Sequence, residues 1–365
     1  MKARLVCLVG LVVVVALAAC KKPPPPTPTD AAPSGGSPSA DASTFTTPTD
    51  VAHPIPENVI FRGLVRPTAL VGTPAFLLVA DAGNGTIAKI DWSGDHHAVL
   101  ARGQSPTSLG LLSRPSEAVW SNDARGGSGS VMRVLLPGID VRDFPVRSVR
   151  TGATFTGVAV VGEDIFFAEE VDGKHGAVTR VTGTVASRLA EFAGVPRAVA
   201  ADAAHVYVAT SAPPKIVRSS RLRGELTEYT FGAGAGFSRI DVHGETFVLG
   251  GEIEGKSGIF TISKLGTAPV LLAARPAGET DFARRGEAVY FLDRAANAVV
   301  CVNLGDRVVG DHVLHMGEAR TVATSPALSA GRALVLHDDD WIYVATDGVS
   351  EGDAGGTGAI LRFAL

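Results

Sequence analysis

The stretch that decides the fold is Val195–Phe231, which reads VPRAVAADAAHVYVATSAPPKIVRSSRLRGELTEYTF. It holds short segments rich in β-branched and aromatic residues, separated by turn formers such as Asp-Ala-Ala and Pro-Pro. We therefore predict four strands, over Ala198–Ala201, Val206–Thr210, Lys215–Ser219 and Leu226–Phe231. One four-stranded sheet leaves both of its faces open, whereas stacked copies bury them, so we expect this stretch to be one unit of a repeat.

The second and third strands of this unit recur along the whole chain. The third-strand copies have apolar residues three positions apart and begin at Ile87, Val131, Val178, Ile216, Ile259, Val299 and Ile360. The second-strand copies are centred on Leu78, Val119, Phe167, Val208, Leu249, Phe291 and Val344, at spacings of 41 to 53 residues. Four strands in a period of roughly 40–45 residues are typical of a β-propeller. The pattern predicts an all-β propeller of about seven four-stranded blades, with six or eight as alternatives.

The two ends of the repeat region predict how the ring closes. Val59–Val65 has the composition of a strand but precedes the first complete unit, and the chain stops at Leu365 after the third strand of the last unit. We expect the N-terminal strand to supply the missing fourth strand of the last blade, because closure removes an open sheet edge.

Irregular spacing predicts insertions in two of the units. Pro137–Ala153 lengthens the second unit, and Ser325–Gly331 and Val349–Thr357 lengthen the seventh. Insertions in propellers fall on loops, where ligands often bind. Surface decoration without a function is the alternative interpretation.

Residues 1–19 form an export signal, with Lys2 and Arg4 before the apolar run Leu5–Ala16 and small residues after it. The apolar run is too short to cross a membrane comfortably. The end of the signal, Leu17-Ala18-Ala19-Cys20, resembles the lipobox of bacterial lipoproteins. That resemblance implies cleavage between Ala19 and Cys20, acyl chains on Cys20 and stable membrane attachment. Because Lys21 rather than Asp follows the cysteine, it also implies the outer membrane of a Gram-negative bacterium.

We predict that residues 20–58 form a tether and that residues 59–365 form the propeller domain. Ten of the 22 prolines fall in Lys21–Asn58, among Thr, Ser, Ala, Asp and Gly. A segment of this composition cannot bury enough apolar surface to fold. Beyond the tether, Cys301 is the last of three cysteines, and its place in an apolar strand predicts a buried side chain rather than a reactive thiol.

One stretch also resembles a known propeller family. In Val79–Ile87, an Ala-Asp pair ends one strand and a Gly-Asn turn leads to the next, as in a blade of the NHL repeat. The likeness is good for this unit and loose for the others. It implies a propeller fold, but NHL-like propellers bind varied partners, so it leaves the function open.

The sharpest polar cluster is the run His337–Asp340 before Trp341. His337, Asp338 and Asp340 are the candidates for a divalent-cation site, because carboxylates and imidazole can ligate such ions. The run aligns with the hairpin turn at Asp202–His205, however, and turns select aspartate for other reasons. We therefore predict a turn, with no metal and no other cofactor.

Composition and motifs narrow the function to two classes. A net charge of −4 without a basic patch argues against nucleic-acid binding. The mature sequence has no phosphate loop, nucleophile elbow, zinc-peptidase pair or Cys-x-x-Cys. A binding or scaffold propeller on the cell envelope, with an unknown protein or small-molecule partner, is the first class. The second is a propeller enzyme, a lactonase or lyase that resembles gluconolactonases. Such an enzyme needs acidic side chains converging from first strands, which offer mainly Asp241, Arg239 and Arg284.

Overall fold

The computed structural model describes residues 58–114, 116–122, 128–136, 145–222, 224–266, 268–276, 281–309, 312–347 and 358–365. These ranges are mostly β-strand, with one short 3-10 helix, η1 (Pro326–Ala330). None of the helical structure in these ranges has the length and apolar character needed to span a membrane. The predicted signal segment, Cys20 and the predicted tether as far as residue 57 lie outside the described residues.

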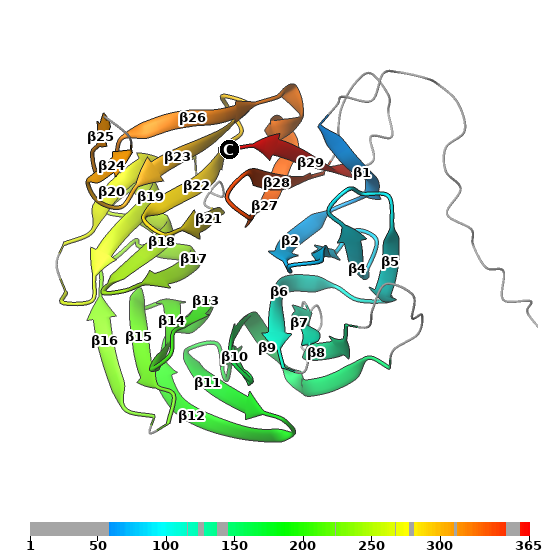
Figure 1. Cartoon of the computed structure of the whole chain (residues 1–365). Helices are drawn as coiled ribbons and strands as arrows, with labels where there is room; N and C mark the ends of the chain where they lie inside the picture. Colours follow the sequence, from blue (N-terminus) through cyan, green and yellow to red (C-terminus); the bar gives the residue numbers. More distant parts are fainter. Residues whose placement is uncertain are drawn as a thin grey trace, which may run out of the picture. The chain divides into compact units, whose positions relative to one another are not determined.

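The strands form antiparallel groups of four, which follow one another around a ring in chain order (Figure 1). We number these groups as sheets along the chain. Sheet 1 comprises β2 (Pro67–Gly72), β3 (Phe76–Asp81), β4 (Thr86–Asp91) and β5 (His97–Ala101). Sheet 2 comprises β6 (Pro106–Ser113), β7 (Ser116–Asn122), β8 (Gly129–Leu135) and the first half of β9 (Arg147–Val161). Sheet 3 comprises the second half of β9, β10 (Asp164–Glu170), β11 (His175–Thr182) and β12 (Val185–Ala193).

The second half of the ring repeats this order. Sheet 4 comprises β13 (Val195–Ala201), β14 (His205–Ser211), β15 (Lys215–Ser220) and β16 (Leu226–Thr230). Sheet 5 comprises β17 (Gly236–His243), β18 (Thr246–Ile253), β19 (Lys256–Ser263) and β20 (Val270–Ala274). Sheet 6 comprises β21 (Phe282–Arg285), β22 (Ala288–Asp293), β23 (Ala298–Asn303) and β26 (Ala319–Thr324). Sheet 7 comprises β27 (Gly331–His337), β28 (Trp341–Thr346), β29 (Gly358–Ala364) and β1 (Val59–Leu64). A separate hairpin is formed by β24 (Arg307–Val309) and β25 (His312–Leu314).

The N-terminal strand β1 lies beside β29, close to the C-terminus (Figure 1). The two strands pair antiparallel, with Phe61 opposite Ile360 and Leu64 opposite Gly358. The backbone N–H of Arg362 extends the contact by donating to the carbonyl of Asn58 at 2.8 Å. The strand β1 is therefore the outer strand of sheet 7, next to β29, the last strand of the chain.

The stretch from Val195 to Phe231 forms sheet 4, with strands that match the four predicted ones to within a few residues at each end. The interpretation of Pro137–Ala153 as an insertion was wrong for its second part. Residues 147–153 are the first half of β9 and pair with β8 as the outer strand of sheet 2. The next residues of the same long strand pair with β10 as the inner strand of sheet 3. One strand thus serves two sheets, which shifts the spacing of the repeat.

Burial follows the position of a strand in its sheet. The second strands, such as β14 (His205–Ser211), are buried at almost every residue, whereas outer strands such as β16 (Leu226–Thr230) are mostly exposed. A strand covered on both faces needs a continuous apolar run, and an outer strand does not. The second strands are rich in apolar residues because each sheet packs against a neighbouring sheet on both of its faces.

The core consists of separate apolar clusters between neighbouring sheets. One cluster joins Tyr207 and Ile216 of sheet 4 to Phe237 and Phe247 of sheet 5. Another joins sheets 1 and 7, at the two ends of the sequence; its buried members include Leu70, Leu77, Val79, Ala333, Tyr343 and Ile360. Contacts between the first and last sheets of the chain therefore resemble those between sheets adjacent in sequence.

Candidate ligand-binding channel

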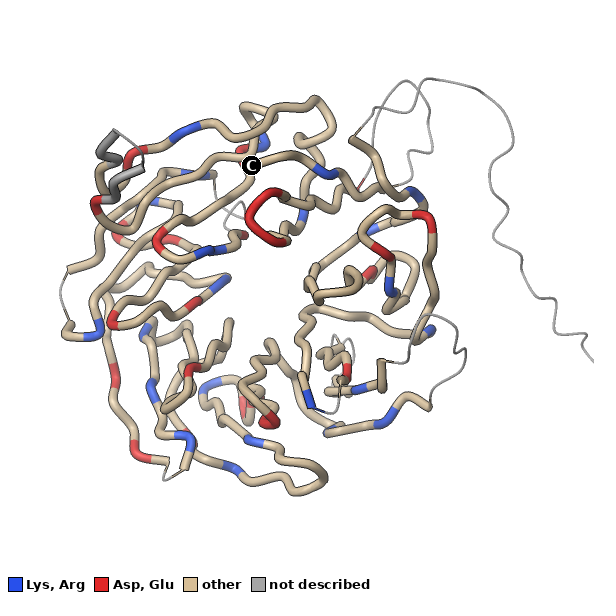
Figure 2. The backbone as a smooth tube through the Cα atoms, in the orientation of Figure 1, with Lys and Arg blue, Asp and Glu red and all other residues tan. Residues whose placement is uncertain are grey.

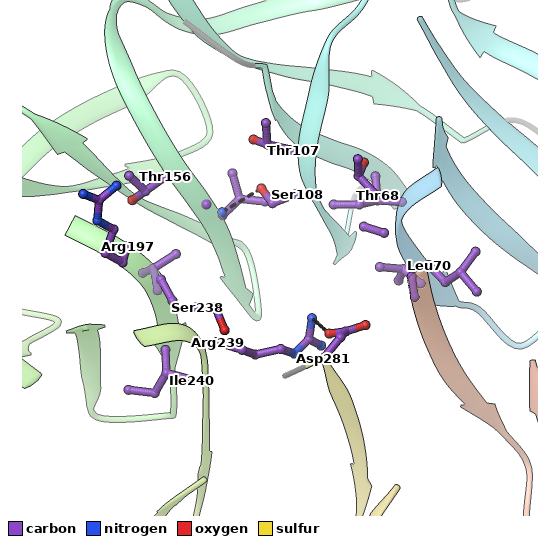
Figure 3. Close-up of a pocket in the computed structure, with 18 of the residues that line it drawn as sticks. Thr68, Leu70, Thr107, Ser108, Thr156, Arg197, Ser238, Arg239, Ile240 and Asp281 are labelled. Carbon is purple, nitrogen blue, oxygen red and sulfur yellow. Dashed lines mark hydrogen bonds and ion pairs between the residues drawn. The ribbon is translucent and has the colours of Figure 1, made fainter. Parts of the chain in front are cut away.

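A cavity of about 250 Å3 lies where the first strands of the sheets meet. Its wall contains residues of β2, β6, β9, β13, β17 and β27, together with Asp281, which directly precedes β21 (Figure 3). Most of the wall consists of hydroxyl-bearing or aliphatic side chains, and its charged residues are Arg197, Arg239 and Asp281. The cavity is thus the central channel of the ring, and every sheet contributes to it.

Six of the described first strands carry the same irregularity where they enter the channel. In each of these first strands, one residue has no partner on the second strand, while the residues before and after it are paired. The skipped residues are Thr68, Thr107, Thr156, Arg197, Ser238 and Arg332. A β-bulge of this kind re-aims the extra side chain and increases the local twist. The repeat therefore places a hydroxyl or a guanidinium group at the same point of six strands.

In four of these strands, the hydroxyl oxygen of the bulged residue lies within 3.5 Å of a carbonyl oxygen of the second strand. The pairs are Thr68 Oγ1 with Ala80 O (3.4 Å), Thr107 Oγ1 with Ser121 O (3.3 Å), Thr156 Oγ1 with Ala168 O (3.5 Å) and Ser238 Oγ with Gly250 O (3.2 Å). A bulge interrupts the ladder of backbone hydrogen bonds, and the hydroxyl supplies a donor at that break. These distances are long for hydroxyl donors, so the bonds orient the side chains more than they stabilise the sheets.

The two arginines of the cavity wall have different partners. Arg239 lies with its Nη1 atom 2.6 Å from Asp281 Oδ1, and this ion pair joins sheets 5 and 6 (Figure 3). Arg197 donates from Nε to Ser211 Oγ at 2.9 Å. Within the described residues, no carboxylate pairs with Arg197, and its side chain is exposed to the channel. Arg197 is consequently the uncompensated charge of the wall.

The surroundings of Asp281 raise the pKa of its carboxyl group and so favour the neutral form. Burial raises the pKa of its carboxyl group, while the Arg239 guanidinium and the backbone N–H groups of Phe282 and Leu334 oppose this rise. Its side chain keeps an opening to solvent, with 26% of its surface exposed. The pKa of Asp281 consequently stays above the usual value for an aspartate.

The three charged residues expected on first strands do not converge on one point. Arg239 pairs with Asp281, whereas Asp241 accepts from Arg284 Nε at 2.7 Å and does not line the cavity. Arg284 also contacts His243 Nδ1 through Nη1 at 2.9 Å. Each carboxylate is therefore matched by a guanidinium from the neighbouring sheet, and the pairs tie sheets 5 and 6 together.

His337 ends β27, and residues 338–340 form the acidic turn between β27 and β28 (Figure 2). His337 Nε2 lies 3.3 Å from Asp338 Oδ2, and the imidazole ring stacks on Trp92. Asp339 is 3.7 Å from Arg285 Nη1, and the backbone carbonyl of Asp340 accepts from Leu365. Across the described ranges, no three His, Cys, Asp or Glu side chains are grouped so as to hold a metal ion.

Two further polar residues are buried: Asp81, which is the aspartate of the Ala-Asp pair in the NHL-like stretch, and Cys301. Asp81 is buried and accepts hydrogen bonds from the backbone N–H groups of Val65, Arg66 and Gly83. Cys301 is 2% exposed and packs in the apolar cluster between sheets 6 and 7, which confirms the expected buried side chain.

Comparison with known proteins supplies the fold class. No family model and no curated protein match the sequence. Solved structures do match. Streptogramin B lyase is 12% identical with a TM-score of 0.57, and the match covers 84% of this chain and 96% of that one. Virginiamycin B lyase from Staphylococcus aureus is 14% identical with a TM-score of 0.56 (81% of this chain and 95% of that one), and the computationally designed Ika8 protein is 14% identical with a TM-score of 0.54 (84% and 100%). The fold is a β-propeller. At these identities the likeness shows the fold of the propeller and nothing of its ligand.

The bulged residues were missed from the sequence, although a signal for them exists. The first strands begin Pro-Thr-Ala-Leu, Pro-Thr-Ser-Leu, Phe-Thr-Gly-Val, Pro-Arg-Ala-Val, Phe-Ser-Arg-Ile and Gly-Arg-Ala-Leu. Thr, Ser or Arg recurs before a small residue and a branched apolar one in most of these units. The expected carboxylates do not coincide with this pattern, because the polar part of the wall consists mainly of hydroxyl groups.

Proposed function

We propose that this chain is a lipid-anchored protein of the cell envelope whose propeller binds a small polar ligand in its central channel. The observation that carries the binding part is the cavity wall, to which every sheet brings side chains and in which hydroxyl and guanidinium groups face one space. Concave sites with a few converging polar groups are typical of ligand binding. The anchor rests on the Leu17–Cys20 motif behind an export signal, and nucleic acid is not among the partners proposed.

The composition of the wall supports binding rather than catalysis. The residues that line the described cavity include no His, Cys, Lys, Tyr or Glu. A general acid–base mechanism needs titratable groups in reach of the substrate. Asp281 is the one carboxylate of this wall, and Arg239 is paired with it. The lactonase or lyase alternative would need several such carboxylates, and this wall supplies one.

A thermal-shift screen on the full-length protein in detergent tests the binding role. The panel contains sugars, sugar acids, amino acids and inorganic anions, and each compound is also checked for chemical change by mass spectrometry, alongside lactone and ester substrates. We expect at least one compound to raise the melting temperature and none to be converted. Turnover of a lactone, or elimination from any substrate, would replace the binding role by the enzyme alternative.

Fractionation tests the anchor separately. With Cys20→Ala, a Gram-negative host should release the protein from the membrane fraction, while the parent stays in the detergent-soluble fraction. A sucrose gradient that separates the two membranes then shows whether the parent protein migrates with the outer membrane. If the variant remains as firmly bound as the parent, the attachment depends on something other than Cys20.

A further inference from the structure

The polar groups of the channel are not distributed evenly, and this asymmetry bears on the class of ligand. The inference rests on the proposed binding role. Thr68, Thr107 and Thr156 belong to sheets 1 to 3, whereas Arg197 and Arg239 belong to sheets 4 and 5 (Figure 3). A ligand in the channel therefore meets the threonine hydroxyl groups from sheets 1 to 3, and from sheets 4 and 5 the two guanidinium groups together with the Ser238 hydroxyl.

The hydroxyl side is arranged to accept hydrogen bonds. Thr68 Oγ1 donates to the carbonyl of Pro106 at 2.9 Å, and Thr156 Oγ1 donates to the carbonyl of Ala168 at 3.5 Å. Thr107 Oγ1 lies 3.3 Å from the carbonyl of Ser121 and shares a shorter hydrogen bond, of 2.8 Å, with the Ser121 hydroxyl. A hydroxyl group has one hydrogen and two lone pairs. Once the hydrogen is directed at the backbone, the oxygen can accept from a ligand, so this side suits hydroxyl or amino groups of the ligand.

The guanidinium side carries a single net charge. Arg239 and Asp281 neutralise each other, so the three charged residues of the wall leave one positive charge, that of Arg197. The Nε atom of Arg197 is engaged by Ser211. Among the described residues, no carboxylate pairs with its two Nη groups, and Arg197 lines the cavity. A pair of guanidinium N–H groups matches the two oxygens of a carboxylate. One positive charge also suits a monoanion better than a phosphate dianion.

We propose that the channel binds a small hydroxylated monocarboxylate, with its carboxylate on Arg197 and its hydroxyl groups on the threonines of sheets 1 to 3. The size of the cavity agrees with this class. Its volume of about 250 Å3 is just below the roughly 300–1,000 Å3 of sites for drug-sized ligands. A compound of the size of a monosaccharide acid fits such a space.

Calorimetric titration of the full-length protein in detergent tests this assignment with glucuronate as the probe. Glucose serves as the neutral compound of similar size and inorganic phosphate as the anion without a carboxylate. We expect glucuronate to bind at least tenfold more tightly than either, which corresponds to about 1.4 kcal/mol. Arg197→Gln should remove that preference, and Arg197→Lys should keep part of it.

The chain offers a matched control for the charge. Arg332 occupies the same bulge position in sheet 7, pairs with Asp347, and does not line the cavity. Arg332→Gln should leave the affinity for glucuronate unchanged, and melting curves of all variants check that they fold. Equal affinity of the Arg197→Gln variant and the parent for glucuronate would overturn the assignment.

The outcomes also separate this inference from the binding role itself. If glucose or another neutral compound binds in the channel as tightly as glucuronate, the carboxylate assignment fails and the binding role stands. If all hydroxycarboxylates bind with a Kd above about 1 mM while another class of compound binds more tightly, the carboxylate assignment again fails and the binding role again stands. If no compound of any class binds, both proposals fail.

Discussion

The indole ring of Trp92 stacks on the imidazole ring of His337, with 3.5 Å between the ring centroids and 12° between the planes. Trp92 follows β4 in sheet 1 and His337 ends β27 in sheet 7, so the pair joins the first and last sheets of the chain. Tyr343 adds to the contact, because its hydroxyl donates to the carbonyl of Trp92 at 3.4 Å. A histidine that was a candidate metal ligand from the sequence is thus part of the contact that joins these two sheets.

Removing the indole should weaken this junction more than it weakens any single sheet. Trp92 is only partly buried, so Trp92→Ala should lower the free energy of unfolding by at most about 3 kcal/mol, the low end for buried aromatics. Trp92→Phe keeps the stacked ring and should cost less. Urea denaturation of both variants measures the difference. Equal loss in the two variants would show that stacking on His337 contributes nothing.

Deleting the N-terminal strand should destabilise the propeller, whereas deleting the predicted tether should not. Removal of residues 1–65 takes away β1, including Leu64, which is 4% exposed and would contribute roughly 1.5–3 kcal/mol. It also exposes the edge of β29, an aggregation risk. Removal of residues 1–57 leaves β1 in place. Thermal melting compares the two, and equal melting temperatures would mean that β1 adds nothing to stability.

Asp81 should be as important as an apolar core residue, because its carboxylate holds the segment between β1 and β2. It accepts from the N–H groups of Val65 and Arg66 at 3.0 and 2.9 Å and from the Asn84 side chain at 2.8 Å. Charged hydrogen bonds of this type contribute roughly 1.5–3 kcal/mol each. We expect Asp81→Ala to lower the free energy of unfolding by about 3 kcal/mol, measured by urea denaturation. Asn84→Ala, which removes one of these donors, should cost less.

Acid should remove a contact between sheets 4 and 5. Burial raises the pKa of Asp202, but hydrogen bonds from Tyr207 Oη (2.7 Å) and Lys264 Nζ (2.9 Å) outweigh it and leave the pKa well below its usual range. A depressed carboxyl pKa stabilises the fold above the unfolded-state value of about 4, and this stabilisation is lost as the pH falls below it. Denaturation at pH 7 and pH 3 should therefore show a smaller difference for Asp202→Asn than for the parent. A difference as large as the parent's would contradict the prediction.

Neutralising Asp281 should strengthen the binding of anions in the channel. Asp281→Asn removes the counter-charge of Arg239 and raises the net charge of the wall by one. Titration with glucuronate should show a lower Kd for the variant, and the gain should shrink at high salt because part of the field is screened. The same affinity in both proteins would place the bound anion away from Arg239.

The class of fold and the order of its strands could be predicted from local patterns of residues. Second strands such as Tyr207-Val208-Ala209 are apolar at every position, a pattern that only a strand covered on both faces requires, and its period predicted stacked sheets. The strands of Val195–Phe231 could be placed because turn formers separate them. Burial and turn chemistry act over a few residues, so they leave a local signal.

The residues that line the channel and the partner of each charged group could not be predicted in this way, because they depend on how the sheets are arranged in space. Arg197 and Thr68 lie far apart in the sequence, and they share a cavity because the ring brings all first strands to one axis. The pairing of Arg239 with Asp281, the stacking of His337 on Trp92 and the division of β9 between two sheets likewise depend on neighbours set by the ring. Such contacts depend on the position of whole sheets, and no local pattern of residues records that position.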